Sequence, residues 1–143
     1  MDREILFRGQ TRKKGEKVRL DGSPIDSNWV YGGIFPNNKG GDFAIIYQQE
    51  PTIEKFTVYA DTVGQYTGKN DKNGTKIFEG DIVKDEQSGY EYVIKWFSEY
   101  ACFALANKNG HMEYDVDEFE MLVNDLIVVG NIHDSSDFAE VSE

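Results

Sequence analysis

The sequence contains a single cysteine, Cys102, and only three prolines among its 143 residues. A lone cysteine excludes an internal disulfide framework and a cysteine-rich zinc site, so we expect an ordinary hydrophobic core to hold the fold. No apolar run approaches the ~18–20 residues that a transmembrane helix needs, and the N-terminal segment lacks the apolar stretch of a secretory signal. We therefore expect a protein of the reducing cytoplasm that does not associate with a membrane.

Basic residues are scarce, above all in the C-terminal part. The chain carries 15 Lys and Arg against 26 Asp and Glu, which gives a formal charge of −11. Residues 1–20 hold seven basic and three acidic side chains, whereas residues 111–143 hold ten acidic side chains and no Lys or Arg. Such a chain repels polyphosphate at long range, so nucleic-acid binding is not expected.

Apolar residues recur mostly with period two, in short runs between turn signals. This pattern is typical of strands rather than helices. In the first part of the chain the runs lie at residues 5–7, 28–35, 43–47 and 55–59. They predict an N-terminal antiparallel β subdomain over residues 1–66.

Residues 67–134 hold a denser series of short apolar runs. These runs lie at residues 77–83, 90–97, 101–106 and 126–132. The pair Asn73-Gly74 favours a hairpin turn before the first of them, because both residues accept a positive φ. We expect the last run to be a closing strand that is buried on both faces. The spacing predicts a C-terminal SH3-like barrel over residues 67–134, followed by an acidic tail over residues 135–143.

One short helix is expected inside this barrel. Val116 and Phe119 lie three residues apart in the segment 115–122, and Asp115 or Asp117 can cap its N-terminus. The chain as a whole is therefore predicted to be mainly β, a β-rich α+β protein.

Several segments resemble the signature of the YopX family in order and spacing. They are Val63-Gly64-Gln65-Tyr66-Thr67-Gly68, Asp71-Lys72-Asn73-Gly74, Ile77-Phe78-Glu79-Gly80-Asp81-Ile82-Val83 and Val129-Gly130-Asn131-Ile132-His133. The resemblance implies a cytoplasmic protein encoded by a bacteriophage or prophage, with an N-terminal part followed by an SH3-like barrel. It supplies no catalytic residues, since the family has no assigned biochemical function.

Neither a phosphate-binding loop nor a metal site is indicated. Gly64 and Gly68 are separated by three residues where a phosphate loop needs four, and Asn70 stands at its Ser/Thr position. A calcium loop centred on Gly74 would begin with the cation Lys69. Two isolated histidines are too few for a metal triad, so we expect no cofactor and no metal.

Glu79 and Asp81 form the one carboxylate pair that raises the question of general acid–base catalysis. A turn that leads into a barrel strand also explains both residues, because Asp81 can accept backbone hydrogen bonds. Turn formation is favoured, and a small hydrolase that uses Glu79 and Asp81 stays open as an alternative.

Aromatic residues form the most suggestive pattern. Tyr90, Tyr92 and Trp96 alternate along one expected strand, and Tyr100 lies in the turn that follows. These side chains either fill the barrel core or form a face that binds a protein partner.

The basic cluster Arg12, Lys13, Lys14 and Lys17 is either a solvated loop or a contact to phosphates or to the acidic part of a neighbouring subunit. The incomplete catalytic motifs, the uneven charge and the aromatics together predict a protein that is not an enzyme. We expect a non-catalytic protein-interaction or assembly module that forms a homo-oligomer and binds a protein partner. An acidic decoy that imitates DNA and inhibits a host nucleic-acid enzyme is the alternative.

Overall fold

A computed structural model of the chain describes residues 4–11, 29–35, 41–48 and 53–134. The basic cluster of residues 12–17 and the tail of residues 135–143 lie outside these ranges. The chain divides into two compact units, Met1–Gln65 and Tyr66–Glu143, which we call the first and second units. The domain boundary that the sequence predicts lies after residue 66, and it stays a prediction.

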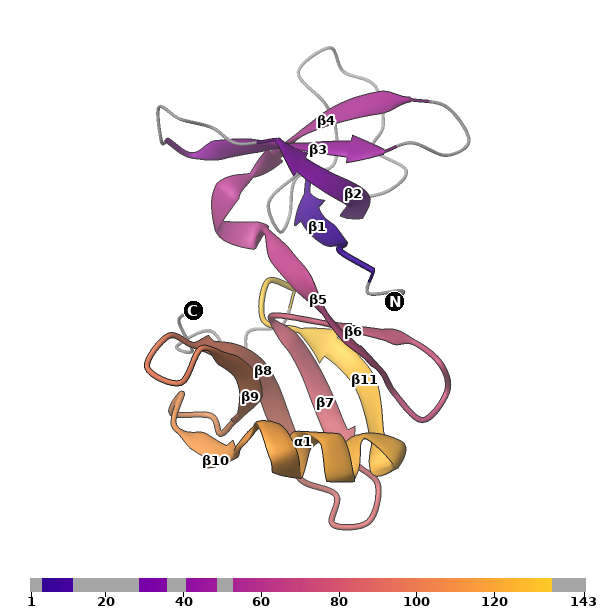
Figure 1. Cartoon of the computed structure of the whole chain (residues 1–143), viewed down its shortest axis with the longest axis vertical. Coiled ribbons are helices and arrows are strands. Elements are labelled where there is room, and N and C mark those ends of the chain that lie inside the picture. Colours follow the sequence, from indigo (N-terminus) through magenta and orange to yellow (C-terminus); the bar gives the residue numbers. More distant parts are fainter. Residues whose placement is uncertain (1–3, 12–28, 36–40, 49–52, 135–143) are drawn as a thin grey trace. The chain divides into compact units, whose positions relative to one another are not determined.

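The first unit is an antiparallel meander of four strands, ordered β4-β3-β2-β1 (Figure 1). The strands are β1 (Phe7–Gln10), β2 (Trp29–Phe35), β3 (Phe43–Gln48) and β4 (Glu54–Tyr59), and the 3-10 turn η1 (Ala60–Thr62) follows them. Val30, Ile46 and Val58 form the buried centre of its core. Each lies on a different strand, and the register between the strands places all three on the same face of the sheet, which is therefore the buried face.

Two glycines let the strands of the first unit approach closely. A Cβ at Gly9 would lie 2.7 Å from a methyl carbon of Val58, and one at Gly32 would overlap the carbonyl group of Tyr47. Larger side chains would push the strands apart at both places.

Strand β5 (Gly64–Asn70) begins at the end of the first unit, where Gly64 and Gln65 pair with β1, and continues into the second unit. There it forms a hairpin with β6 (Lys76–Phe78). The hairpin turn predicted at Asn73-Gly74 is present, and Gly74 has a φ of 84°. Its connection is longer than two residues, since β5 ends at Asn70 and β6 begins at Lys76.

The second unit contains a five-stranded antiparallel sheet, ordered β10-β9-β8-β7-β11. The strands are β7 (Asp81–Asp85), β8 (Glu91–Phe97), β9 (Cys102–Ala106), β10 (Met112–Tyr114) and β11 (Leu126–Asn131). The prediction of a mainly β protein with antiparallel sheets is confirmed. Neither sheet closes on itself within the described residues, so the SH3-like barrel stays a prediction.

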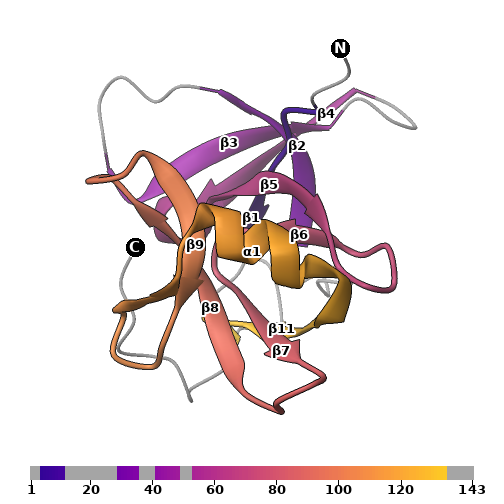
Figure 2. The same ribbon diagram turned by 60° about the horizontal axis from the view of Figure 1, so that its bottom comes forward.

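The predicted helix is confirmed as α1 (Val116–Leu122), which leads into the 3-10 turn η2 (Val123–Asp125). Asp115 is the N-cap: its side chain accepts a hydrogen bond from the Glu118 N–H, and the Glu118 side chain accepts one from the Asp115 N–H. The helix lies against β9 (Figure 2) and also contacts β10. Its Phe119 is fully buried in the core of the second unit.

The prediction that residues 126–132 form a strand buried on both faces is wrong in its second part. Among the residues that the structure describes, strand β11 pairs with β7 alone, at the edge of the sheet. Leu126 is fully buried, but Val129 is 46% exposed. A continuous apolar run does not specify whether both faces of a strand are covered, because the covering side chains come from distant parts of the chain.

No helix in the described ranges is both long enough and apolar enough to span a bilayer.

Candidate functional site

The second unit has a groove of about 640 Å³ between the start of β8 and the β9–β10 hairpin. Its lining residues are Gly89, Tyr90, Glu91, Tyr92, Asn107, Lys108, Asn109, Glu113 and Tyr114. We call it the tyrosine groove. Its volume lies within the ~300–1,000 Å³ of ordinary ligand sites.

Tyr92 and Tyr114 form the inner part of the tyrosine groove. Tyr92 is only 7% exposed and belongs to the core, while the ring of Tyr114 meets it edge-on with 5.4 Å between the centroids. Burial, followed by the hydrogen bond with the Tyr114 side chain, raises the pKa of Tyr92 to about 12. The Tyr92 hydroxyl is therefore neutral at physiological pH, and packing holds the two rings in a fixed geometry.

Hydrogen bonds of Asn107 shape the β9–β10 wall of the groove. Its side-chain oxygen accepts from the N–H groups of Asn109 (2.9 Å) and His111 (3.1 Å). Its amide nitrogen donates to the Glu113 carboxylate at 2.9 Å. The loop that carries Lys108 is therefore tied to the strand that carries Glu113.

Tyr90 stands at the rim of the groove and is 68% exposed. Its backbone is fixed: the Tyr90 carbonyl accepts from the Asp85 N–H at 2.9 Å, and Gly89 supplies the φ of 80° that the preceding turn requires. A large ring on a fixed backbone offers contact area to a partner at a small cost in conformational entropy.

The predicted aromatic row is divided by the structure. Tyr90 and Tyr92 line the tyrosine groove, whereas Trp96 is 41% exposed and packs edge-on against Phe103, 5.0 Å between centroids. Tyr100 is 66% exposed in the β8–β9 turn and does not line the groove. The row was predicted either to fill the core or to form an exposed face. Tyr92 lies in the core, whereas Tyr90, Trp96 and Tyr100 are exposed.

Sequence reasoning missed Tyr114 and Asn107 as groove residues. Strand β10 has only three residues and pairs with β9 through a register shift between Met112 and Tyr114. A short irregular strand has no clear alternation, so its partner and its facing side chains are not visible in the sequence.

The YopX family model, described as YopX protein, matches residues 26–140. The chain belongs to the YopX family. The family resemblance predicted from the motifs is thereby confirmed. The YopX chain is also similar to the crystal structure of protein EF1440 from Enterococcus faecalis, with a TM-score of 0.49 and 19% identity over 92% of this chain and 95% of that chain. No curated protein matches the sequence.

The motif residue Glu79 lies in the connection between β6 and β7, and the motif residue Asp81 is the first residue of β7. Asp81 is 1% exposed, and its carboxylate accepts a hydrogen bond from the Phe78 N–H at 2.7 Å. Gly80 between them donates to the Ile94 carbonyl at 2.8 Å. Asp81 therefore has the turn-forming contact that the sequence favoured. Neither carboxylate lines the tyrosine groove, and the hydrolase alternative stays an untested prediction.

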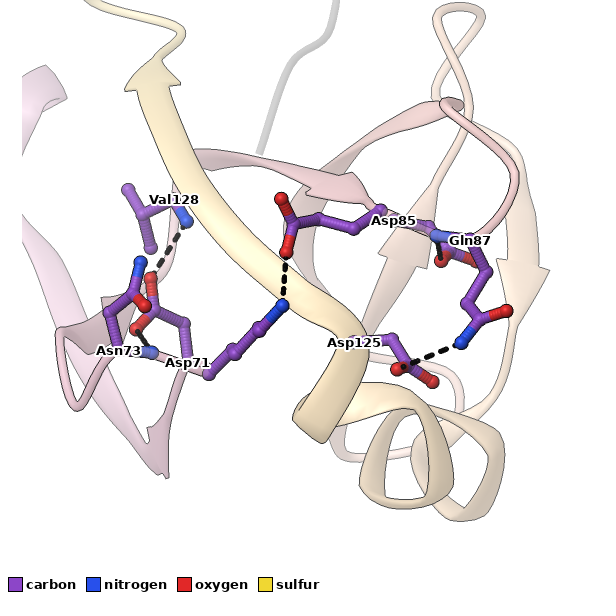
Figure 3. A network of polar contacts seen from close by, with 8 residues as sticks. Asp71, Asn73, Asp85, Gln87, Asp125 and Val128 are labelled. Atoms are coloured by element: carbon purple, nitrogen blue, oxygen red, sulfur yellow. Dashed lines mark hydrogen bonds and ion pairs between the residues drawn. The ribbon is translucent and has the colours of Figure 1, made fainter.

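The motif residue Asp71 joins the β5–β6 hairpin to β11 (Figure 3). One carboxylate oxygen accepts from the N–H groups of Asn73 (2.8 Å) and Thr75 (2.9 Å), and the other accepts from the Val128 N–H at 2.9 Å. The Lys72 N–H adds a bond of 2.9 Å to the Leu126 carbonyl. Asp71 is 7% exposed, so it acts as a buried structural connector.

The second half of this network joins the β7–β8 turn to η2 (Figure 3). The Lys72 ammonium lies 2.6 Å from the Glu86 carboxylate, whose hydrogen bond and charge raise the pKa of Lys72. Gln87 donates through its N–H to Asp85 at 2.8 Å and through its side chain to Asp125 at 3.4 Å. Within the described ranges no His, Cys, Asp or Glu residues form a group that could hold a metal ion.

Proposed function

We propose that the chain is a non-catalytic protein-interaction module encoded by a phage or prophage, which binds a protein partner in the host cytoplasm through the tyrosine groove. In this proposal residues 67–134 are an SH3-like domain, residues 1–66 are a separate β domain, and the chain forms a homo-oligomer. The observation that carries the proposal is a groove of about 640 Å³ with three tyrosines, one buried and one 68% exposed.

The chemistry of the tyrosine groove suits protein recognition. Tyrosine is enriched at the centres of interfaces, where its ring supplies apolar area and its hydroxyl supplies a hydrogen bond. Glu91, Lys108 and Glu113 add a polar rim, and Asn107 and Asn109 add amide groups. This combination of apolar floor and polar rim is common in specific protein interfaces.

The same lining residues give little support to catalysis. His, Cys, Ser and Thr are not among the groove residues that the structure describes. A pKa of about 12 makes Tyr92 a poor general base near neutral pH. The proposal therefore assigns binding to the groove, with Glu91, Lys108 and Glu113 as its polar rim.

The test is affinity purification of the full-length chain from a lysate of its bacterial host, with quantitative mass spectrometry. Tyr90→Ser should reduce recovery of a specific partner by about tenfold, which is the loss of a single interface hot spot. Tyr100→Ser is the matched control, since Tyr100 is 66% exposed but lies outside the groove. Equal recovery by the wild type and both variants would refute the proposal.

The acidic decoy remains a second candidate because of one observation. The second unit holds six basic and seventeen acidic residues, while the first unit holds nine of each, so the second unit carries the whole formal charge of −11. Asp117 and Glu120 are exposed on α1. Partner binding that is lost in the variant D117N/E120Q and kept in Tyr90→Ser would favour the decoy over the groove.

A further inference from the structure

The outer face of the first unit's sheet is aromatic. Phe43 pairs with Tyr59, Phe35 with Ile45, and Tyr47 with Lys55 across strands β2, β3 and β4. Side chains alternate between the two faces of a sheet, so these residues lie opposite the core face that holds Ile46 and Val58. We call this surface the aromatic face and define it by Tyr31, Phe35, Phe43, Ile45, Tyr47 and Tyr59.

Three rings of the aromatic face are strongly exposed. Phe35 is 54% exposed, Phe43 is 49% exposed and Tyr31 is 44% exposed. Phe35 stacks on Tyr47 with 6.4 Å between the centroids, and Phe43 packs against Tyr59 at 5.2 Å. Ile45, which pairs with Phe35 and lies between Phe43 and Tyr47 on the same face of β3, joins the two ring pairs into one apolar surface. An exposed apolar surface of this kind marks an interaction site.

The face also has room for a partner's side chains. Gly33 lies on it between Tyr31 and Phe35, and a Cβ at Gly33 would meet nothing within 4 Å. The positions on β2, β3 and β4 lie side by side in one sheet (Figure 1). A ring from a second molecule can thus insert beside Tyr47 without displacing backbone.

The charge distribution indicates through which unit two copies of the chain can meet. The first unit is balanced, with nine basic and nine acidic residues, whereas the second unit holds six basic and seventeen acidic residues. Two copies that meet through their second units bring together two formal charges of −11 and repel each other. Two copies that meet through their first units meet no such net charge at the contact.

We propose that the aromatic face joins two copies of this chain, packed against each other around a two-fold axis. A two-fold interface uses the same patch on both subunits, and an aromatic patch is complementary to itself through stacked and edge-on ring pairs. The proposal rests on the self-association part of the proposed function and deepens it. It does not depend on the tyrosine groove, which lies in the other unit.

The available area sets the strength of the contact. Rings of this size bury roughly 150–250 Å² each when fully covered, so three half-exposed rings contribute about 300 Å² per copy and about 600 Å² in total. Stable interfaces bury about 1,200–2,000 Å². The three rings alone therefore supply about half of the area of a stable interface or less, so we expect a weak dimer that becomes populated only at high protein concentration.

Salt should strengthen this dimer. Raising ionic strength from about 0.1 M to about 1 M shortens the Debye length from about 10 Å to about 3 Å, which screens repulsion between the second units. An apolar contact is not weakened by this screening. Association through a contact between the basic segment of residues 12–17 and the acidic part of another copy would instead weaken as salt is added, because screening removes the attraction between them.

The experiment is sedimentation velocity of the full-length chain over a concentration series at low and high salt. We expect the weight-average sedimentation coefficient to rise with concentration, and to rise more at high salt. The double variant F35S/F43S should weaken association by about tenfold or more. Ile34→Ser is the matched control, since Ile34 is 38% exposed next to Phe35 but on the opposite face.

A measurement on the wild-type chain avoids the risk that the variant misfolds. In a dilution series followed by NMR, signals of Ile45 and Tyr47 should move with concentration while those of the buried Ile94 stay constant. A monomer at every concentration, association that weakens with salt, or shifts confined to the second unit would each overturn the proposal. Tyr90→Ser should leave association unchanged; a monomeric chain that still loses its partner in Tyr90→Ser would refute the dimer and retain the groove.

Discussion

The connector role of Asp71 makes a quantitative prediction for the stability of the second unit. Its carboxylate accepts from three backbone N–H groups, two in the β5–β6 turn and one in β11, at 2.8–2.9 Å. A hydrogen bond to a charged group contributes about 1.5–3 kcal/mol, but water can replace part of this in the exposed turn. We therefore expect Asp71→Ala to cost about 2–4 kcal/mol of unfolding free energy, a large part of the ~5–15 kcal/mol of a typical domain.

The assay is urea unfolding followed by tryptophan fluorescence. The chain has two tryptophans, Trp29 in the first unit and Trp96 in the second. A Trp29→Phe background therefore makes fluorescence a reporter of the second unit alone. With a slope of about 1–2 kcal/mol per molar urea, Asp71→Ala should lower the midpoint by about 1–4 M.

The control is Glu99→Ala, which removes an exposed carboxylate of the β8–β9 turn and should change stability by less than about 0.5 kcal/mol. The urea midpoint of Asp71→Asn should lie between those of the wild type and Asp71→Ala. An amide keeps one acceptor oxygen but turns a donor toward the Val128 N–H. A midpoint for Asp71→Ala within the range of Glu99→Ala would refute the argument that this carboxylate joins the hairpin to β11.

Two further predictions concern backbone packing and pH. Gly32→Ala should lower the stability of the first unit by about 2–3 kcal/mol or more, since the new Cβ would overlap the Tyr47 carbonyl. Gly33→Ala, whose Cβ meets nothing within 4 Å, should be neutral or stabilising by about 0.5 kcal/mol. Urea unfolding of both variants in a Trp96→Phe background measures the difference. The pKa of Tyr92 is raised to about 12 in the folded state, above its value of about 10 in the unfolded chain. The contribution of the Tyr92 hydroxyl to the free energy of unfolding is therefore complete below pH ~10 and is lost as the pH rises toward 12. Tyr92→Phe should flatten the decline of the urea midpoint over this pH interval, and an unchanged decline would contradict the assignment.

Local patterns in the sequence were sufficient to predict which segments form strands and which segment forms the helix. Period-two alternation identified β2, β3, β4 and β8, because a half-buried strand needs apolar side chains on one face only. Asp115 and Phe119 identified α1, since an N-cap and a buried residue on the first turns are both local features. The YopX motifs predicted the family through the turns around Gly74 and Gly80.

Features that depend on distant partners were not accessible in this way. The apolar run of β11 was predicted to be buried on both faces, but Val129 is 46% exposed, because the segments that cover each face come from elsewhere in the chain. The row of Tyr90, Tyr92 and Trp96 alternates regularly, yet α1 and the β9–β10 hairpin decide which of these rings is covered.

The amino-acid sequence alone determined that this chain is mainly β, that it belongs to the YopX family, and that its negative charge is concentrated toward the C-terminus. Those properties depend on composition and on neighbours within a few residues. Only the tertiary structure decided that Tyr114 joins Tyr90 and Tyr92 around one groove, and that Phe35 and Phe43 share an exposed face. Strand pairing brings these residues together across gaps in the sequence, and register between strands is set by packing of the whole sheet.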